Sequence, residues 1–189
     1  MKITSGKYKY RNIEIPRGIR PTTEKVREAI FSMIMQWIPE ADVLDLFAGS
    51  GAMGLEALSR GAARCTFVEM NRQNQKVILS NIANCGAGEE AAVLGRDFEA
   101  ALDELGRKKE RQVFDIVIID PPYEKTDYYD TALIKLQDLG LIDESSVVVC
   151  EHLYDNKLLD TYGNLAKIRE KKYGTIGVDL FTVDNDGPF

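Results

Sequence analysis

The spacing of apolar residues predicts alternating strands and helices from residue 42 onward. Short apolar runs are typical of buried strands, whereas apolar positions three and four apart are typical of the inner face of a helix. Apolar runs predict strands at 43–47, 65–68, 91–94, 113–119 and 147–150. Helical spacing between them predicts helices at 51–60, 72–84, 98–105 and 129–136.

Repeated strand–helix units predict an α/β fold with a mostly parallel, doubly wound sheet. The nearly continuous apolar run at 113–119 suits a central strand that is buried on both faces. The last segment differs, because 164–173 and 175–184 are two extended stretches around Gly174 with alternating apolar and polar residues. These two stretches predict an antiparallel strand pair at the end of the sheet.

The first forty residues do not follow the strand–helix alternation. Residues 2–15 alternate in polarity and predict a small hairpin. An apolar stripe then predicts a helix that starts near Pro21 and ends at Pro39, with Trp37 in the core. We therefore expect a hairpin–helix extension (1–40) followed by the main domain (41–189).

Composition adds limits rather than a function. The chain has 189 residues, of which 44% are hydrophobic and 29% charged, as in ordinary globular proteins. No apolar run approaches the roughly 20 residues of a membrane span, and residues 1–7 lack a signal-peptide core. Cys65, Cys85 and Cys150 lie too far apart for a zinc or disulfide pattern. We expect a cytoplasmic protein, a monomer, with no membrane contact and no metal.

The charge is distributed unevenly along the chain. The net charge is −6, but residues 1–27 hold eight basic and two acidic side chains, so this segment carries +6 and the rest −12. Such asymmetry favours a basic arm that contacts phosphates. On charge alone, a solvated hairpin with scattered lysines fits equally well.

A glycine-rich loop, GSGAMG at 49–54, follows the first predicted strand. Glycines let the backbone approach a ligand and turn sharply into a helix. Glu69 ends the next strand and can accept hydrogen bonds from two ribose hydroxyls. The loop also fits the spacing of dinucleotide-binding proteins, so a nicotinamide or flavin cofactor has to be considered.

Asp45 separates the two cofactor classes. A carboxylate four residues before Gly49 repels a pyrophosphate but attracts the sulfonium and ammonium groups of S-adenosylmethionine, which the sequence therefore favours. Asp97 can accept a hydrogen bond from the adenine amine or cap the following helix, and both roles stay open. The candidate cofactor-binding residues are Asp45, Phe47, Gly49, Ser50, Gly51, Glu69, Met70, Asp97 and Phe98.

A second loop, Asp120-Pro121-Pro122-Tyr123, follows the predicted central strand, and we call it the acceptor loop. An amine on a base is a weak nucleophile, and it needs its hydrogens bound so that its lone pair faces the methyl donor. Asp120 and the Pro121 carbonyl can accept these hydrogens, while Tyr123 can stack on the base. The proline pair fixes the backbone, although such a pair also marks surface turns. These four residues are the catalytic candidates, whereas His152 is expected to face solvent.

Several segments resemble the bacterial 16S rRNA guanine-N2 methyltransferases of the RsmD type. Residues 45–62 look like that family's cofactor motif, and 20–31 its N-terminal signature. The segments 6–7, 67–71, 120–123 and 171–175 are similar as well. The resemblance covers nearly the whole chain, and 20–31 is its most specific part.

The resemblance implies a Rossmann-like class I methyltransferase fold and S-adenosylmethionine as cofactor. It implies methylation of the N2 amine of a guanine in 16S rRNA, with the rRNA or the small ribosomal subunit as partner. It also implies that the arm contacts RNA, although Arg20 and Thr22 could instead order the acceptor loop. The RNA-binding candidates are Lys7, Arg11, Arg17, Arg20 and Thr22.

Other functions stay open at this point. The nearest are methylation of adenine N6 or cytosine N4, in DNA or another RNA, and of a protein glutamine amide. A ribosome-assembly factor that binds the cofactor or RNA without turnover is an alternative from another class.

Overall fold

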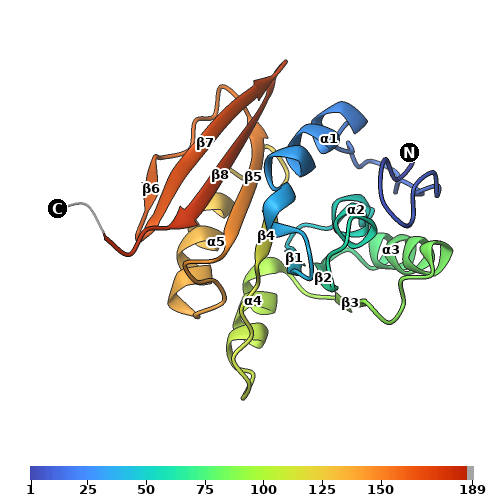
Figure 1. Cartoon of the computed structure of the whole chain (residues 1–189), viewed down its shortest axis with the longest axis horizontal. Helices are drawn as coiled ribbons and strands as arrows, with labels where there is room; N and C mark the ends of the chain where they lie inside the picture. Colours follow the sequence, from blue (N-terminus) through green and yellow to red (C-terminus); the bar gives the residue numbers. More distant parts are fainter. Residues whose placement is uncertain (187–189) are drawn as a thin grey trace.

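One eight-stranded sheet organises residues 1–186, the part of the chain that the computed structural model describes (Figure 1). The strand order is β3-β2-β1-β4-β5-β8-β7-β6. The strands are β1 (Asp42–Asp45), β2 (Arg64–Val68), β3 (Ala91–Leu94), β4 (Ile116–Ile119), β5 (Val147–Leu153), β6 (Thr161–Tyr162), β7 (Leu165–Tyr173) and β8 (Ile176–Val183). The helices are α1 (Glu24–Met33), the 3-10 helix η1 (Met35–Trp37), α2 (Ala52–Ser59), α3 (Arg72–Cys85), α4 (Phe98–Gly106) and α5 (Asp127–Asp138).

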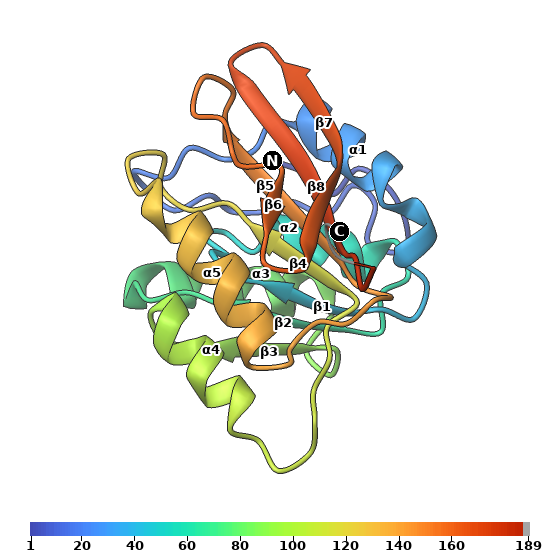
Figure 2. The same cartoon turned by 90° about the vertical axis from the view of Figure 1, so that its left-hand side faces the viewer.

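Alternating strand residues build one hydrophobic core on each face of the sheet. Val43 and Ile116 point to the face that α1, α2 and α3 cover. Leu44 and Val117 point to the opposite face, where α4 and α5 pack side by side (Figure 2). Helices on both faces of a largely parallel sheet confirm the doubly wound α/β prediction.

The parallel part and the antiparallel end follow the predicted order, with three differences. Strands β1 to β5 are parallel, and β8 pairs antiparallel with both β5 and β7. β4 is shorter than predicted, because residues 113–115 precede it: the Phe114 N–H donates to the carbonyl of Leu141, and the Asp115 N–H to that of Asp42 at the start of β1. β6 was not predicted, because a strand of two residues is too short to show an alternation of apolar and polar positions. β5 runs three residues beyond the predicted 147–150.

The prediction for His152 is wrong. The longer β5 carries this residue into the sheet, where its side chain is 1% exposed. Its Nε2 lies 3.2 Å from an oxygen of Asp179 on β8. Gly177 on β8 makes room for the ring, because a Cβ there would come within 2.5 Å of it. Lys167 lies 3.1 Å from the same carboxylate and adds a positive charge beside it.

Residues 1–23 form an arm that packs on α2 and α3 (Figure 1). Instead of the predicted hairpin strands, a single bridge joins Lys2 to Asn12. Ile3 and Ile13 are buried in the same core as α1 and β1. Gly6 sits so close to α2 that a Cβ would lie 1.8 Å from the Ser59 carbonyl oxygen. The arm is therefore packed into the main core along its length.

Glu56 holds the arm to the main domain. Its carboxylate lies on α2 with 0% exposure, and it accepts hydrogen bonds from the Thr4 N–H and hydroxyl and from the Ser5 N–H. The guanidinium nitrogens Nε of Arg27 and Arg60 lie 3.2 Å and 3.0 Å from its two oxygens. Two cations and three hydrogen bonds compensate a charge that would otherwise be costly to bury.

We predict that Glu56→Ala lowers the free energy of unfolding by about 3–5 kcal/mol, because it leaves Arg27 buried without its counter-charge. Urea denaturation measures this change. Arg64→Ala is the matched control, since it removes the exposed pair with Asp42, which should contribute less than about 1 kcal/mol. Equal losses in the two variants would contradict the anchoring role of Glu56.

Candidate active site

A cavity of about 830 Å³ opens at the carboxyl ends of β1, β2 and β4. The strand order reverses between β1 and β4, and ligands of such sheets bind outside that point. Residues 18–22 of the arm form another wall. The predicted site residues that line it are Arg20, Thr22, Asp45, Phe47, Gly49, Ser50, Glu69, Met70, Asp97, Phe98, Asp120, Pro121, Pro122 and Tyr123.

The glycine loop turns directly from β1 into α2. Gly51 does not line the cavity but forms the N-cap of α2, with a φ of +80° that favours glycine. Gly54 packs against β2, where a Cβ would lie 2.3 Å from the Phe67 ring. Its N–H donates to Asp45 Oδ2 at 3.1 Å. The loop thus places a buried carboxylate beside the start of a helix.

Asp45 lies at the cavity wall with 3% exposure. Burial raises its pKa to about 7; the Gly54 N–H opposes the rise and the charge of Glu69 adds to it. The site therefore disfavours another anion and favours a positively charged ligand group. That preference fits a sulfonium or ammonium better than a pyrophosphate.

Backbone N–H groups orient the two other acidic side chains at this end. Glu69 accepts from the Gly49 N–H at 3.0 Å and from the Asn71 N–H at 2.8 Å. Each carboxylate oxygen has a second lone pair, so Glu69 can still accept ligand hydroxyls. Asp97 caps α4 by accepting the Ala100 N–H at 3.0 Å, which confirms the capping alternative. Its role toward adenine stays a prediction.

Three aromatic rings form an apolar wall at the same end. Phe47 and Phe98 lie 5.1 Å apart between ring centroids, and Tyr128 of α5 lies 4.7 Å from Phe98. Tyr128 was not predicted, because only the fold brings α5 to this position. Met70 stands at the rim with 69% exposure. The wall gives a flat ring an apolar surface to lie against.

The acceptor loop ends β4 on the other side of the cavity. Burial raises the pKa of Asp120 well above its usual range, and the charges of Glu151 and Asp45 add to the rise. The hydroxyl of Thr22 lies 3.5 Å from Asp120 Oδ2, so the arm reaches the acceptor loop. Burial likewise raises the pKa of Tyr123 to about 12, which keeps its hydroxyl protonated at neutral pH.

Glu151 is a site residue that sequence reasoning missed. It lies behind the cavity on β5, accepting the Thr22 hydroxyl at 2.8 Å and the Tyr123 hydroxyl at 3.4 Å. A usable signal existed, because Glu151 follows the run 147–150 just as Asp120 follows 113–119. Carboxyl ends of neighbouring parallel strands meet at one edge of the sheet.

The structure divides the five RNA-binding candidates into two groups. Arg20 and Thr22 line the cavity, and Arg17 precedes Gly18 at its mouth. Lys7 instead pairs with Glu90, just before β3 begins. Arg11 lies near the last turn of α3, where burial raises the pKa of Cys85 and the charge of Arg11 opposes the rise. Lys7 and Arg11 therefore lie at the opposite edge of the sheet from the cavity, where the parallel strands start.

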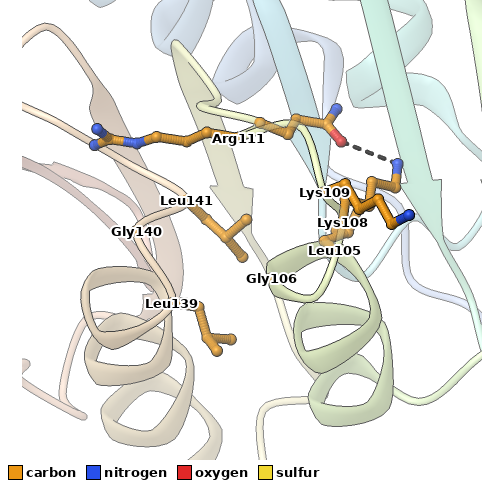
Figure 3. A pocket seen from close by; sticks show the side chains of 9 residues that line it. Leu105, Gly106, Lys108, Lys109, Arg111, Leu139, Gly140 and Leu141 are labelled. Atoms are coloured by element: carbon orange, nitrogen blue, oxygen red, sulfur yellow. Dashed lines mark hydrogen bonds between the residues drawn. The ribbon is translucent and has the colours of Figure 1, made fainter.

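A second hollow, of about 150 Å³, lies at that opposite edge between the end of α4 and residues 139–141 (Figure 3). Lys108, Lys109 and Arg111 border it, and Lys108 donates to the side chain of Gln112 at 3.0 Å. It contains none of the predicted site residues.

Over residues 1–186, no group of three or more His, Cys, Asp or Glu side chains is arranged to hold a metal ion. No helix in this range is long and apolar enough to cross a membrane.

Comparison with known proteins identifies similar chains. The family model described as Conserved hypothetical protein 95 matches residues 1–182. Ribosomal RNA small subunit methyltransferase D of Escherichia coli strain K12 is 33% identical over 189 residues, which cover 99% of this chain and 92% of that protein. Its namesake from Haemophilus influenzae is 29% identical over 184 residues, covering 96% and 93%.

Solved structures agree with the fold. The yhhF protein of Escherichia coli has a TM-score of 0.85 and 33% identity, covering 97% of this chain and 98% of that one. An RNA methyltransferase from Salinibacter ruber, solved in complex with S-adenosyl-L-homocysteine, has a TM-score of 0.64 at 16% identity, covering 89% and 97%. The class I methyltransferase fold predicted from the sequence is confirmed.

We predict that Asp45→Asn stabilises the protein at alkaline pH while weakening binding of the predicted cofactor. Burial raises the folded-state pKa of Asp45, so the folded state binds more protons and the wild type loses stability as pH rises from about 4 to about 7. Asparagine does not ionise and keeps an acceptor for Gly54. The variant should gain roughly 2–4 kcal/mol at pH 8 and little at pH 4.

Urea denaturation at both pH values measures the stability, and calorimetry with S-adenosylmethionine measures the binding. A stability difference that does not change with pH would refute the assignment of a strongly disfavoured charge at Asp45.

Proposed function

The chain belongs to the Conserved hypothetical protein 95 family, which is the RsmD family, and we propose that it methylates the N2 amine of a guanine in 16S rRNA. Its relatives named ribosomal RNA small subunit methyltransferase D support an rRNA methyltransferase. One observation carries the proposed methylation of an amine: a single cavity joins the Asp45 and glycine-loop end to the Asp120-Pro121-Pro122-Tyr123 loop. A methyl donor and a planar amine can therefore meet there.

S-adenosylmethionine is the cofactor that the structural neighbours support. When bound, it supplies an electrophilic methyl group on a sulfonium. We assign Asp45 to its positive groups, Glu69 to its ribose hydroxyls and Phe47 and Phe98 to its adenine. Asp97 also lines the cavity, and we assign it to the adenine amine.

Asp120 and the Pro121 carbonyl bind the two hydrogens of the acceptor amine in this mechanism. Binding both hydrogens turns the nitrogen lone pair away from the protein and toward the methyl donor. Alignment of this kind supplies much of the rate in a transfer between two bound groups. The methylated amine is acidic, so Asp120 can take its proton as it leaves. Tyr123 stacks on the base, which must be unpaired or flipped out to reach the cavity.

The proposed partner is 16S rRNA or the small ribosomal subunit. Arg20 lines the cavity, and Arg17 is exposed and adjoins Gly18, which also lines it, so we assign both arginines to phosphates beside the target nucleotide. A cytoplasmic monomer suits this substrate. Guanine is preferred over adenine because of family membership, since Asp120 and Pro121 can bind either amine.

The deciding experiment uses tritiated S-adenosylmethionine and small ribosomal subunits from cells that lack the enzyme. After digestion of the RNA, label in N2-methylguanosine is the expected result. Label in another nucleoside would keep amino-methylation and discard the guanine assignment. Cofactor binding without labelled RNA would favour a DNA or protein substrate, or an assembly factor without turnover.

We predict that Asp120→Ala and Glu69→Ala fail in different ways. Asp120→Ala should reduce turnover by roughly 100-fold or more while the cofactor Kd changes little, because it removes an acceptor for the amine. Glu69→Ala should mainly raise the cofactor Kd. Single-turnover methylation and calorimetry separate the two effects. Near-wild-type turnover in Asp120→Ala would contradict the catalytic assignment.

We predict that Arg17→Glu weakens RNA binding more than Arg11→Glu does. The two variants change the net charge equally, but Arg17 lies at the cavity mouth and Arg11 at the opposite edge. Filter binding at several salt concentrations measures the affinity and its salt slope, which should flatten for Arg17→Glu. Equal effects would mean that RNA covers both edges of the protein or that charge acts only at long range.

A further inference from the structure

The carboxylates of Asp120, in the acceptor loop, and Glu151, behind it, lie next to each other. Asp120 ends β4, and Glu151 lies near the end of β5, which pairs with β4 in parallel. Glu151 is 4% exposed and is absent from the cavity lining. Across residues 1–186, no Lys, Arg or His nitrogen lies within 4.0 Å of either carboxylate. Burying this pair without a counter-charge works against folding.

A single hydroxyl connects the two carboxylates. Thr22 Oγ1 lies 2.8 Å from Glu151 Oε2 and 3.5 Å from Asp120 Oδ2. A hydroxyl has one hydrogen, so it can donate to only one carboxylate at a time. The shorter distance assigns that hydrogen to Glu151. Tyr123 donates to the other Glu151 oxygen at 3.4 Å, so both donors come from segments that line the cavity.

Glu151 also reaches the helix that follows the acceptor loop. Its backbone carbonyl accepts the hydroxyl of Tyr129 on α5 at 2.6 Å. One residue of β5 thus contacts the arm, the acceptor loop and α5. A shift of Glu151 would move Thr22 and Tyr123 together, on either side of Asp120.

We propose that Glu151 is a positioning residue that holds Thr22 and Tyr123, and so fixes the arm and the acceptor loop around Asp120. This inference rests on the proposed amine-methylating function of the same cavity. The negative charge of Glu151 also acts on Asp120 directly. The other groups facing Asp120 are Asp45 from β1, Tyr123 from its own loop and Tyr129 from α5. The charges of Arg20 from the arm and His152 from β5 act on Glu151.

The charge of Glu151 should shift the pH dependence of turnover in a direction that can be measured. Asp120 binds an amine hydrogen best when ionised, so turnover should rise as pH passes the pKa of Asp120. Burial raises this pKa, and the charge of Glu151 adds to the rise. Glu151→Gln keeps the size and one acceptor oxygen but removes the charge. The acidic limb of the kcat profile should therefore move to lower pH, by about one unit.

Loosening of Thr22 and Tyr123 should at the same time lower the maximal kcat of Glu151→Gln by roughly 10- to 100-fold. The cofactor Kd should not change, because Glu151 does not line the cavity. Thr22→Val, which loses the hydroxyl, should lower kcat similarly, and Thr22→Ser should restore it. Glu144→Gln, exposed at the other end of β5, is the control and should behave as the wild type.

A carboxyl NMR titration of Asp120 in the wild type, Glu151→Gln and Glu144→Gln completes the test without needing turnover. A lower Asp120 midpoint only in Glu151→Gln, together with the shifted kcat limb, supports the inference. An unchanged or higher midpoint overturns it, as does full kcat in Thr22→Val. If the labelled nucleoside is not N2-methylguanosine, the guanine assignment fails, while the NMR midpoint still decides the role of Glu151.

Discussion

The buried carboxylate of Glu56 is the contact on which the arrangement of the site depends. It binds Thr4 and Ser5 at the start of the arm and pairs with Arg27 on α1. The arm is thus fixed both before and after residues 18–22, which form a wall of the cavity. Fixing both ends of a loop lowers the entropy that its middle must lose on ligand binding. Thr22 can therefore meet Asp120 and Glu151 without the loop having to order first.

The parallel strands concentrate negative charge where the cavity opens. Asp45, Glu69, Asp120 and Glu151 follow or end β1, β2, β4 and β5 at the same edge. Burial raises the pKa of Asp45, Asp120 and Glu151, and the charges of His152 and Arg20 only partly oppose the rise at Glu151. This arrangement lowers the stability of the protein without ligand, and a positively charged ligand group would partly offset that loss.

Sequence patterns predicted the strands, the helices and most of the cavity because these depend on local periodicity and on the rule that ligands bind at carboxyl ends of parallel strands. They failed for polar residues whose burial depends on distant partners. Glu56 is compensated by residues up to 52 positions away, and Glu151 by Thr22 at 129 positions. His152 was misplaced because its strand continues past the apolar run, to pair with Gly177. No local pattern records such partners.

The charge of the arm shows a similar limit. The net charge of +6 over residues 1–27 favoured a basic arm that contacts phosphates, but the folded arm runs from one end of the parallel strands to the other. Lys7 is already paired with Glu90, while Arg17 and Arg20 stand at the cavity. Residues at the far edge cannot touch phosphates that adjoin a base inside the cavity unless the RNA wraps around α2 and α3. One half of the basic segment therefore ties the arm to the main sheet, and we propose that the other half, near the cavity, contacts RNA.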